Sequence, residues 1–306
     1  SLMNDVLGSL TSLKYARDHF EPWMANEPRT PFPPYDQFGA QAWVMYQPKG
    51  TVGIIGTWNA PLFTLFSPLA SALAAGNRAI LKPSEVVSCT ARVVAEAVVD
   101  MFDPLEVGVV TGGPDMGEIF TSQPFDHIVF TGSTQVGRAV MRNAAQNLVP
   151  VTLELGGKSP QIIFGDADMD AMTTVVTNAI VQNAGQTCSA ASRILVERPV
   201  FDTVVARMAE RYRALRVGPA LADPDVGPVI SARQRDRAHA RDLRLAVALA
   251  FVELPRMRHA RKSNDHDAGW CPSPLHWVHR PAPDQHLAPR FGDGLRGQDL
   301  VLLIGL

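Results

Sequence analysis

Residues 51–56 read TVGIIG, a short and continuous apolar run that stops at a glycine. Such a run predicts a strand that is buried on both faces of a sheet. Helix-compatible residues 68–75 follow it and end at Gly76, and residues 78–82 read as a second strand. A strand, a helix and another strand in this order form the unit from which parallel sheets are built.

The same alternation extends along the chain. It predicts further strands at residues 42–47, 106–111, 127–131, 161–164 and 193–196. It predicts further helices at residues 4–25, 90–102, 116–121, 135–147, 168–183 and 200–215. Because crossovers between parallel strands are right-handed, we expect an α/β fold with a Rossmann-like parallel sheet and helices on both of its faces.

The spacing of the glycines near these strands is only weak evidence for a nucleotide-binding site. Gly50, Gly53 and Gly56 miss the dinucleotide fingerprint, and Gly132 and Gly137 match a phosphate-binding loop without its lysine. The stretch GSTQVG at residues 132–137 nevertheless joins a strand to a helix. Its amides and the helix dipole can therefore face a pyrophosphate, to which Ser133 can donate.

Lys82 and Glu85 follow the second strand, at the place where dinucleotide folds bind the adenosine ribose. Glu85 as an acceptor for ribose hydroxyls favours NAD. Lys82 argues partly for NADP, since an ammonium beside the ribose tolerates a 2′-phosphate. The alternative for the pair is a solvated loop.

Cys188 lies on a small, polar turn, NAGQTCS at residues 183–189, and is the candidate nucleophile. A thiol attacks as thiolate, so it needs a cation, a helix terminus or a base. The candidate base is Glu154, which the strand-like run VTLELGGK at residues 151–158 delivers next to two glycines. Burial would make this carboxylate a usable base. The alternatives are a buried, inert cysteine and a solvated glutamate.

Five stretches resemble, in family order, signature motifs of the aldehyde dehydrogenase superfamily. The stretch at residues 48–62 resembles the family's proline-tryptophan-asparagine segment, with Thr57 before the tryptophan. The stretches are GQTC (185–188), LELGGK (153–158), PKGTVGIIGTWNAPL (48–62), LKPSE (81–85) and FTGS (130–133). Variants at residues 56–59, 111–113, 125–128 and 148–152 are similar to the class 3 and coniferyl aldehyde dehydrogenase branch.

The resemblance implies a mechanism and a fold. It implies that Cys188 attacks an aldehyde, that Asn59 and the Cys188 backbone N–H stabilise the oxyanion, and that Glu154 activates water to hydrolyse the thioester. For Asn59 the alternative is an ordinary turn residue. The fold implied is a Rossmann-like cofactor domain followed by a partial α/β catalytic domain.

The cofactor implied is NAD, with NADP as the second option, and the product is a carboxylic acid. The substrate expected is an aromatic aldehyde such as coniferyl aldehyde, or a medium-chain aliphatic one. The expected cofactor-binding residues are Ile55, Gly56, Thr57, Trp58, Lys82, Ser84, Glu85, Gly113, Gly132, Ser133, Thr134, Val136, Gly137, Leu155 and Gly156.

Three regions are expected: a cofactor-binding domain at residues 1–153 with an N-terminal helix and a bridging strand, a partial catalytic domain at 154–240, and an atypical tail at 241–306. Six of the eight histidines lie at or after His239, and periodicity fades there. A shifted reading frame is our hypothesis for the tail, with a divergent tail as the alternative. The family's homodimer is in doubt, because no C-terminal strand is recognisable.

Composition limits the class of protein. The chain has 306 residues, a hydrophobic fraction of 46% and a net charge of −2, which favour a globular protein with no nucleic-acid or membrane partner. Its three cysteines and its histidines lack metal-ligand spacing, so no metal is expected. Without a signal-peptide pattern or a long apolar run, we expect a cytoplasmic protein. Ser1 and Leu2, before Met3, read as an expression remnant.

Two other functions stay open at this point. The chain can be a truncated, catalytically impaired homologue that acts only as a nucleotide-binding or interaction protein. It can also be an acyl-thioester reductase, for which the sequence offers no dedicated acyl-carrier feature.

Overall fold

The computed structural model describes residues 2–245 and 300–304, and these fall into two compact units. Unit 1 comprises Ser1–Lys158 and Val181–Ala190, and unit 2 comprises Ser159–Ile180 and Ala191–Leu306. The segment with Cys188 therefore belongs to the same unit as Glu154. The functional division at residues 153 and 240 stays a prediction.

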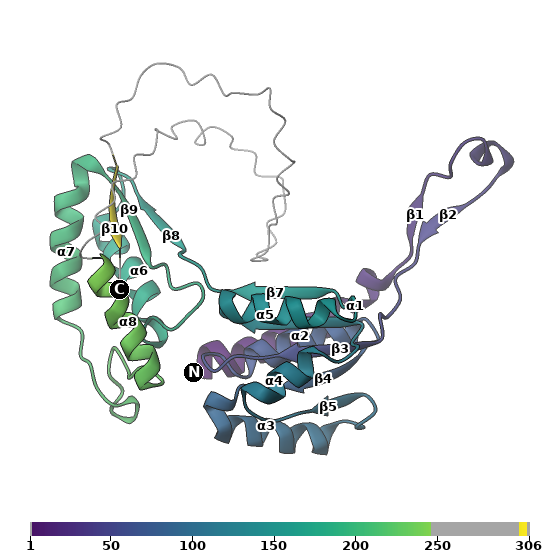
Figure 1. Cartoon of the computed structure of the whole chain (residues 1–306). Coiled ribbons are helices and arrows are strands. Elements are labelled where there is room, and N and C mark those ends of the chain that lie inside the picture. The colour runs from purple at the N-terminus through teal and green to yellow at the C-terminus, as the bar shows by residue number, and fades with distance from the viewer. Residues whose placement is uncertain (1, 246–299, 305–306) are drawn as a thin grey trace. The chain divides into compact units, whose positions relative to one another are not determined.

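Unit 1 is built on a parallel sheet in the order β5-β4-β3-β6-β7 (Figure 1). Its strands are β3 (Thr51–Ile55), β4 (Arg78–Lys82), β5 (Val107–Val109), β6 (His127–Gly132) and β7 (Val151–Leu155). In register, Ile55 pairs with both Lys82 and Phe130. The expected α/β fold with a parallel sheet is thus confirmed, and β3, the first strand of the sheet, lies at its centre.

Helices cover both faces of this sheet because alternate side chains of each strand point to opposite faces. On one face, α2 (Phe63–Ala74) and α3 (Ser88–Met101) pack on Val52, Ile54 and Leu81. On the other, α4 (Pro114–Thr121) and α5 (Thr134–Ala145) pack on Ile128 and Phe130. The N-terminal helix α1 (Gly8–Met24) packs against α2.

Helix α2 begins at Phe63, five residues before the start expected at residue 68, and includes Pro68. The reason is a cap from a distant segment, the π-helical turn η1 (Leu2–Leu7). The buried Asp5 carboxylate accepts hydrogen bonds from the backbone N–H groups of Leu62 (2.9 Å) and Phe63 (2.7 Å). These donors would otherwise lack a partner at the helix start, so Asp5 fixes where α2 begins.

A two-stranded antiparallel hairpin precedes the sheet, formed by β1 (Glu27–Arg29) and β2 (Ala42–Val44) with the turn η2 (Tyr35–Phe38) between them. The strand expected at residues 42–47 is shorter, and β1 was not expected because the prolines that follow it indicated an interruption. The hairpin exposes Phe32, Phe38 and Trp43.

Unit 2 contains a three-stranded sheet in which β9 (Arg193–Glu197) lies between β8 (Pro160–Ile163) and β10 (Leu300–Ile304). Its helices are α6 (Met169–Val181, which ends in unit 1), α7 (Phe201–Arg213) and α8 (Ala232–Leu245). The expectation of no recognisable strand after residue 241 was wrong. Residues 300–304 read LVLLI, an apolar run that pairs antiparallel with β9. Residues 246–299 of the tail lie outside the described residues.

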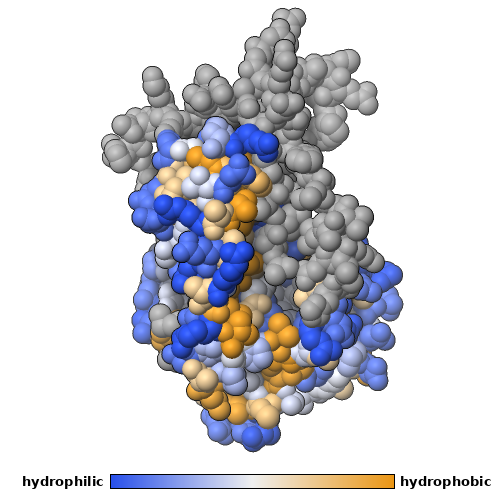
Figure 2. Space-filling view, turned by 90° about the vertical axis from the view of Figure 1, so that its left-hand side faces the viewer, coloured by the Kyte–Doolittle hydropathy of each residue, from blue (hydrophilic) through white to orange (hydrophobic). Residues whose placement is uncertain are grey.

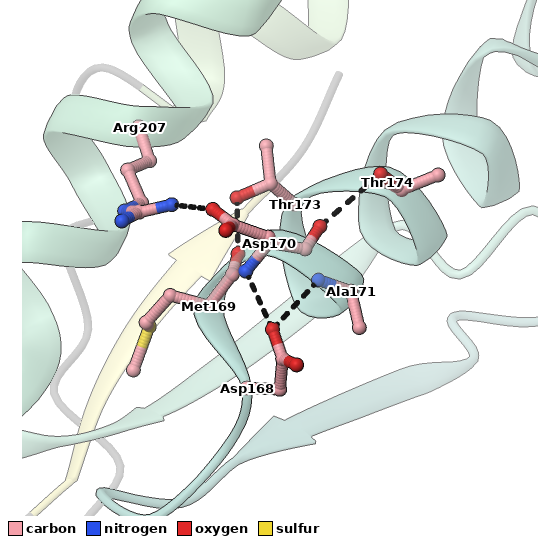
Figure 3. A network of polar contacts seen from close by, with 7 residues as sticks. All are labelled: Asp168, Met169, Asp170, Ala171, Thr173, Thr174 and Arg207. Atoms are coloured by element: carbon pink, nitrogen blue, oxygen red, sulfur yellow. Dashed lines mark hydrogen bonds and ion pairs between the residues drawn. The ribbon is translucent and has the colours of Figure 1, made fainter.

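The start of α6 is held by a network of polar contacts (Figure 3). The Asp168 carboxylate accepts from the backbone N–H groups of Asp170 (2.9 Å) and Ala171 (3.0 Å). The neighbouring Asp170 carboxylate pairs with Arg207 of α7, which joins the two helices. The hydrogen bonds from Ala171 and Asp170 hold the pKa of Asp168 below its usual value, because they stabilise the charged form.

We predict that Asp5→Ala destabilises unit 1. Two backbone N–H groups at the start of α2 lose their acceptor, so the free energy of unfolding should fall by about 1–2 kcal/mol. Urea unfolding followed by circular dichroism measures this. Asp100→Ala, at an exposed aspartate on α3, is the matched control; an equal loss in both variants would contradict the capping role.

We predict that acid destabilises unit 2 partly through Asp168. Because its folded pKa is lowered, its contribution is complete above the unfolded pKa of about 3.9 and is lost as the pH falls through the folded pKa. Thermal unfolding of the wild type and Asp168→Asn between neutral and strongly acidic pH tests this. The gap between them should narrow as the pH falls, and a constant gap would exclude a titrating cap.

Candidate functional site

The expected site residues gather at one edge of the unit 1 sheet. Because its five strands are parallel, their carboxyl ends meet at the same edge, where nucleotide ligands bind in open α/β sheets. After β3, the chain adds β4 and β5 on one side, then crosses over and adds β6 and β7 on the other side of β3. The strand order therefore reverses between β3 and β6, the topological switch point beside which such ligands bind. After the strands come residues 56–59 (β3), Ser84 and Glu85 (β4), Gly113 (β5), Ser133 (β6) and Gly156 (β7).

A cleft of about 410 Å³ opens at this edge beside α3. Part of its wall is apolar, formed by Pro83, Ala91 and Ala95. The charged groups at its wall are Glu85 and Arg92. An apolar wall beside a carboxylate suits a flat heterocycle that is joined to a sugar with hydroxyl groups.

Lys82 directly precedes Pro83 of this cleft, and its side chain is almost fully buried (4% exposed). Its ammonium donates to the Gly112 carbonyl at 3.2 Å and lies 3.7 Å from the Glu85 carboxylate. A buried ammonium needs such partners, because burial without them is costly. The ion pair therefore holds Glu85 at the cleft, although the Glu85 side chain itself is 43% exposed.

The turn after β6 offers donors to an anion. Ser133 caps α5: its hydroxyl oxygen accepts from the Val136 backbone N–H at 3.3 Å, so its own proton stays available to donate. Ser133, Thr134 and Val136 are exposed at the start of this helix. Gly137 is buried, and a Cβ there would lie 3.0 Å from Leu155, so this glycine permits the close packing of α5 on β7.

Some expected cofactor residues can contribute only through their backbone. The Ile55 side chain is part of the apolar core, and Gly56 is buried where a Cβ would lie 2.7 Å from Leu65. Gly132 and Leu155 are half-buried neighbours in register. None of these placements tests their expected roles, which stay predictions.

The nucleophile turn, residues 183–189, has an unusual backbone. Asn183 (φ 51°), Ala184 (φ 53°) and Gly185 (φ 73°) are three consecutive residues in the left-handed region. Glycine adopts this conformation freely and asparagine often, but at Ala184 it costs about 1–2 kcal/mol. Strain of this kind persists only where surrounding contacts impose it, and it is enriched at functional sites. Cys188 is exposed at the end of this turn.

Asn59 is joined to the nucleophile turn by hydrogen bonds in both directions. Its side-chain Nδ2 donates to the Gln186 carbonyl at 2.8 Å, and its own carbonyl accepts from Asn183 Nδ2 at 3.1 Å. Only one Nδ2 hydrogen is used by Gln186, so the second can serve another acceptor. The structure therefore brings the expected oxyanion donor next to the turn that carries Cys188.

Glu154 and Cys188 belong to segments that meet, but Glu154 is not buried. A Cβ added to Gly157 would lie 3.8 Å from the Cys188 carbonyl oxygen, which places the two motifs side by side. Glu154, however, is exposed on β7, the edge strand of the sheet. Among the described residues, Glu154 therefore lacks the burial that would make it a usable base.

Sequence reasoning missed two parts of the site. Ser88, Ala91 and Ala95 line the cleft from α3; their small side chains recur at helical spacing, a signal that was readable. The hydrogen bonds around Asn59 link residues far apart in the chain and had no such signal. Among described residues, no group of three metal-ligand side chains occurs. Nor does the described part contain a helix long and apolar enough to cross a membrane.

A family model described as the aldehyde dehydrogenase family matches residues 3–248. Coniferyl aldehyde dehydrogenase of a Pseudomonas species is 44% identical over 239 residues, which are 78% of this chain and 49% of that protein. The 4,4′-diaponeurosporen-aldehyde dehydrogenase of Staphylococcus aureus is 35% identical over 75% of this chain and 50% of its own length. The chain thus spans about half the length of these relatives.

Solved structures that are similar to this chain are also aldehyde dehydrogenases, and the chain again covers about half of each. Aldehyde dehydrogenase from Mycobacterium tuberculosis complexed with NAD+ is similar with a TM-score of 0.71 and 38% identity, over 78% of this chain and 48% of that one. The substrate-bound state of Staphylococcus aureus AldH is similar with a TM-score of 0.71 and 33% identity, over 82% of this chain and 54% of that one.

Proposed function

Because this chain belongs to the aldehyde dehydrogenase family, we propose that it oxidises an aldehyde to a carboxylic acid with NAD or NADP, through a thioester on Cys188. The observation that carries the proposal is the hydrogen bond from Asn59 to Gln186, which joins an amide donor to the strained turn before Cys188. Nucleophile and oxyanion donor thereby lie in one unit.

In this mechanism the Cys188 thiolate adds to the aldehyde carbon, and the carbonyl oxygen becomes an alkoxide. The free N–H of Asn59 Nδ2 and the Cys188 backbone N–H are the donors to that oxygen. A preorganised donor of this kind typically contributes about 3–4 kcal/mol to transition-state stabilisation. The alkoxide then reforms the carbonyl as the C–H bond breaks, and the carbon stays bonded to sulfur as a thioester.

The cofactor, when bound, accepts the hydride that leaves this carbon. The cleft fits its adenosine half: Pro83, Ala91 and Ala95 offer an apolar wall, and Glu85 can accept from ribose hydroxyls. Ser133 and the backbone N–H groups at the start of α5 can bind the pyrophosphate. Glu85, held by Lys82, favours the unphosphorylated ribose of NAD.

Glu154 is the candidate base for hydrolysis of the thioester. It takes a proton from water as the water attacks the acyl carbon, and the Cys188 thiolate leaves with the acid as product. Its exposure leaves it accessible to water but without the burial that favours a base. The expected result is slow hydrolysis, with acylation faster than release.

The substrate class proposed is aromatic aldehydes, on the basis of the similarity to coniferyl aldehyde dehydrogenase. A medium-chain aliphatic aldehyde is the second choice. We further propose a cytoplasmic protein that forms a homodimer, for which the exposed aromatic side chains of the β1–β2 hairpin offer an apolar contact surface.

We predict that Ala95→Phe weakens NAD binding more than tenfold, because the phenyl ring fills the cleft next to α3. Calorimetric titration with NAD measures the dissociation constant. Val99→Phe adds the same ring at a 74% exposed position of the same helix and should bind as the wild type does. Equal affinity for all three proteins would place the cofactor elsewhere.

We predict that NADH forms when coniferyl aldehyde and NAD are added, and that Cys188→Ala abolishes it while Cys89→Ala does not. In Glu154→Gln, a burst of NADH equal to one turnover should persist and steady turnover should slow, because acylation precedes the step that needs the base.

Loss of the burst together with steady turnover would contradict the role of Glu154. Retained NAD binding without any NADH in the wild type would favour the second candidate, a nucleotide-binding protein without catalysis. The exposure of both Glu154 and Cys188 is the observation that supports this candidate.

A further inference from the structure

We propose that Thr57 is a positioning residue, whose hydroxyl fixes the orientation of the Asn59 side-chain amide. The proposal rests on the function proposed above. The Thr57 hydroxyl donates to Asn59 Oδ1 at 2.6 Å, on the opposite side of the amide from its contact with Gln186. The family's segment has a proline before the tryptophan where this chain has Thr57, and the resemblance assigns no task to this threonine.

The two contacts together define which end of the amide is which. Gln186 offers a carbonyl oxygen, which only Nδ2 can approach as a donor. The Thr57 hydroxyl then donates to Oδ1, an atom that cannot donate. If the amide rotated by half a turn, Oδ1 would face the Gln186 carbonyl, and both atoms are acceptors. The bond from Thr57 to Oδ1 also opposes smaller rotations of the amide.

Thr57 is itself held in place by helix α2. Its backbone N–H donates to the Thr64 hydroxyl at 2.9 Å, and that hydroxyl donates to the Ala60 carbonyl at 2.9 Å. Thr64 lies next to Phe63, where Asp5 caps the helix. Asp5 thus holds the start of α2, and Thr64, the next residue of that helix, holds Thr57 next to Asn59.

The consequence for chemistry concerns the second N–H of Asn59 Nδ2. With both ends of the amide bonded, this N–H has one direction, and the bond from Thr57 to Oδ1 polarises the amide and makes it a better donor. Preorganised donors lower the barrier because they need no rearrangement as charge develops on the substrate oxygen. Thr57 thus acts through Asn59 and does not itself need to touch the substrate.

The test uses acylation of Cys188 by p-nitrophenyl acetate, which requires the nucleophile and an oxyanion donor but no cofactor. Thr57→Val removes only the hydroxyl, and Thr57→Ser retains it. We expect the saturating rate of p-nitrophenolate release in Thr57→Val to fall roughly five- to tenfold, the effect of about one hydrogen bond, while half-saturation changes less than twofold. Thr57→Ser should recover the rate to within about twofold.

The matched control is Thr174→Val, which removes an exposed threonine hydroxyl in unit 2 and should leave the rate unchanged. A Thr57→Val rate equal to that of the wild type would overturn the proposal. An equally large loss of rate in Thr57→Ser would also overturn it. Serine keeps the hydroxyl, so such a loss would show that the hydroxyl is not what sets the rate.

A second measurement tests directly whether Thr57 orients the Asn59 amide. It does so even if the wild type shows no acylation, a result that would refute only the proposed function. The Asn59 side-chain amide gives a pair of NMR resonances that are identified by their loss in Asn59→Asp. We expect Thr57→Val to shift this pair, because Oδ1 loses its hydrogen bond and the amide changes orientation, and Thr57→Ser to restore it. Unchanged resonances in Thr57→Val would show that the hydroxyl does not orient the amide.

Discussion

The hydrogen bond from Asn59 Nδ2 to the Gln186 carbonyl joins two segments that are 127 residues apart in the chain. It fastens the loop after the central strand β3 to the turn that carries Cys188. That turn holds Ala184 in a left-handed conformation that costs free energy, so contacts with the rest of unit 1 have to maintain it. This bond, together with the bond from Asn183 Nδ2 to the Asn59 carbonyl, is the contact that the turn makes with the loop after β3.

The parallel sheet supplies the rest of the arrangement. Because the strands run in one direction, the loop with Asn59, the ion pair of Lys82 with Glu85, and the capped start of α5 all emerge at the same edge. The residues proposed for nucleotide binding and the proposed oxyanion donor therefore lie at one edge of the same sheet. The buried Lys82 contributes by holding the Glu85 carboxylate at the cleft.

The sequence predicted β3, β4 and β6 well because each is a short apolar run followed by a helix, the pattern of strands in a sheet covered on both faces. It misplaced the start of α2, because the cap comes from Asp5, more than fifty residues earlier in the chain. It missed β10, whose pairing with β9 is long-range. It left open whether Glu154 is buried or solvated, since a strand-like run does not reveal which of its side chains the rest of the fold covers. Side-chain directions such as that of Thr57 likewise follow from tertiary contacts.

The most direct test of the central claim is to identify the covalent intermediate. Coniferyl aldehyde and NAD are mixed with the protein, the reaction is stopped with acid, and the peptide that contains Cys188 is weighed by mass spectrometry. The account predicts that this peptide gains the mass of the acyl group when NAD is present and not when it is omitted. An acyl group on Cys89 instead, or an unmodified Cys188 in a protein that produces NADH, would contradict it.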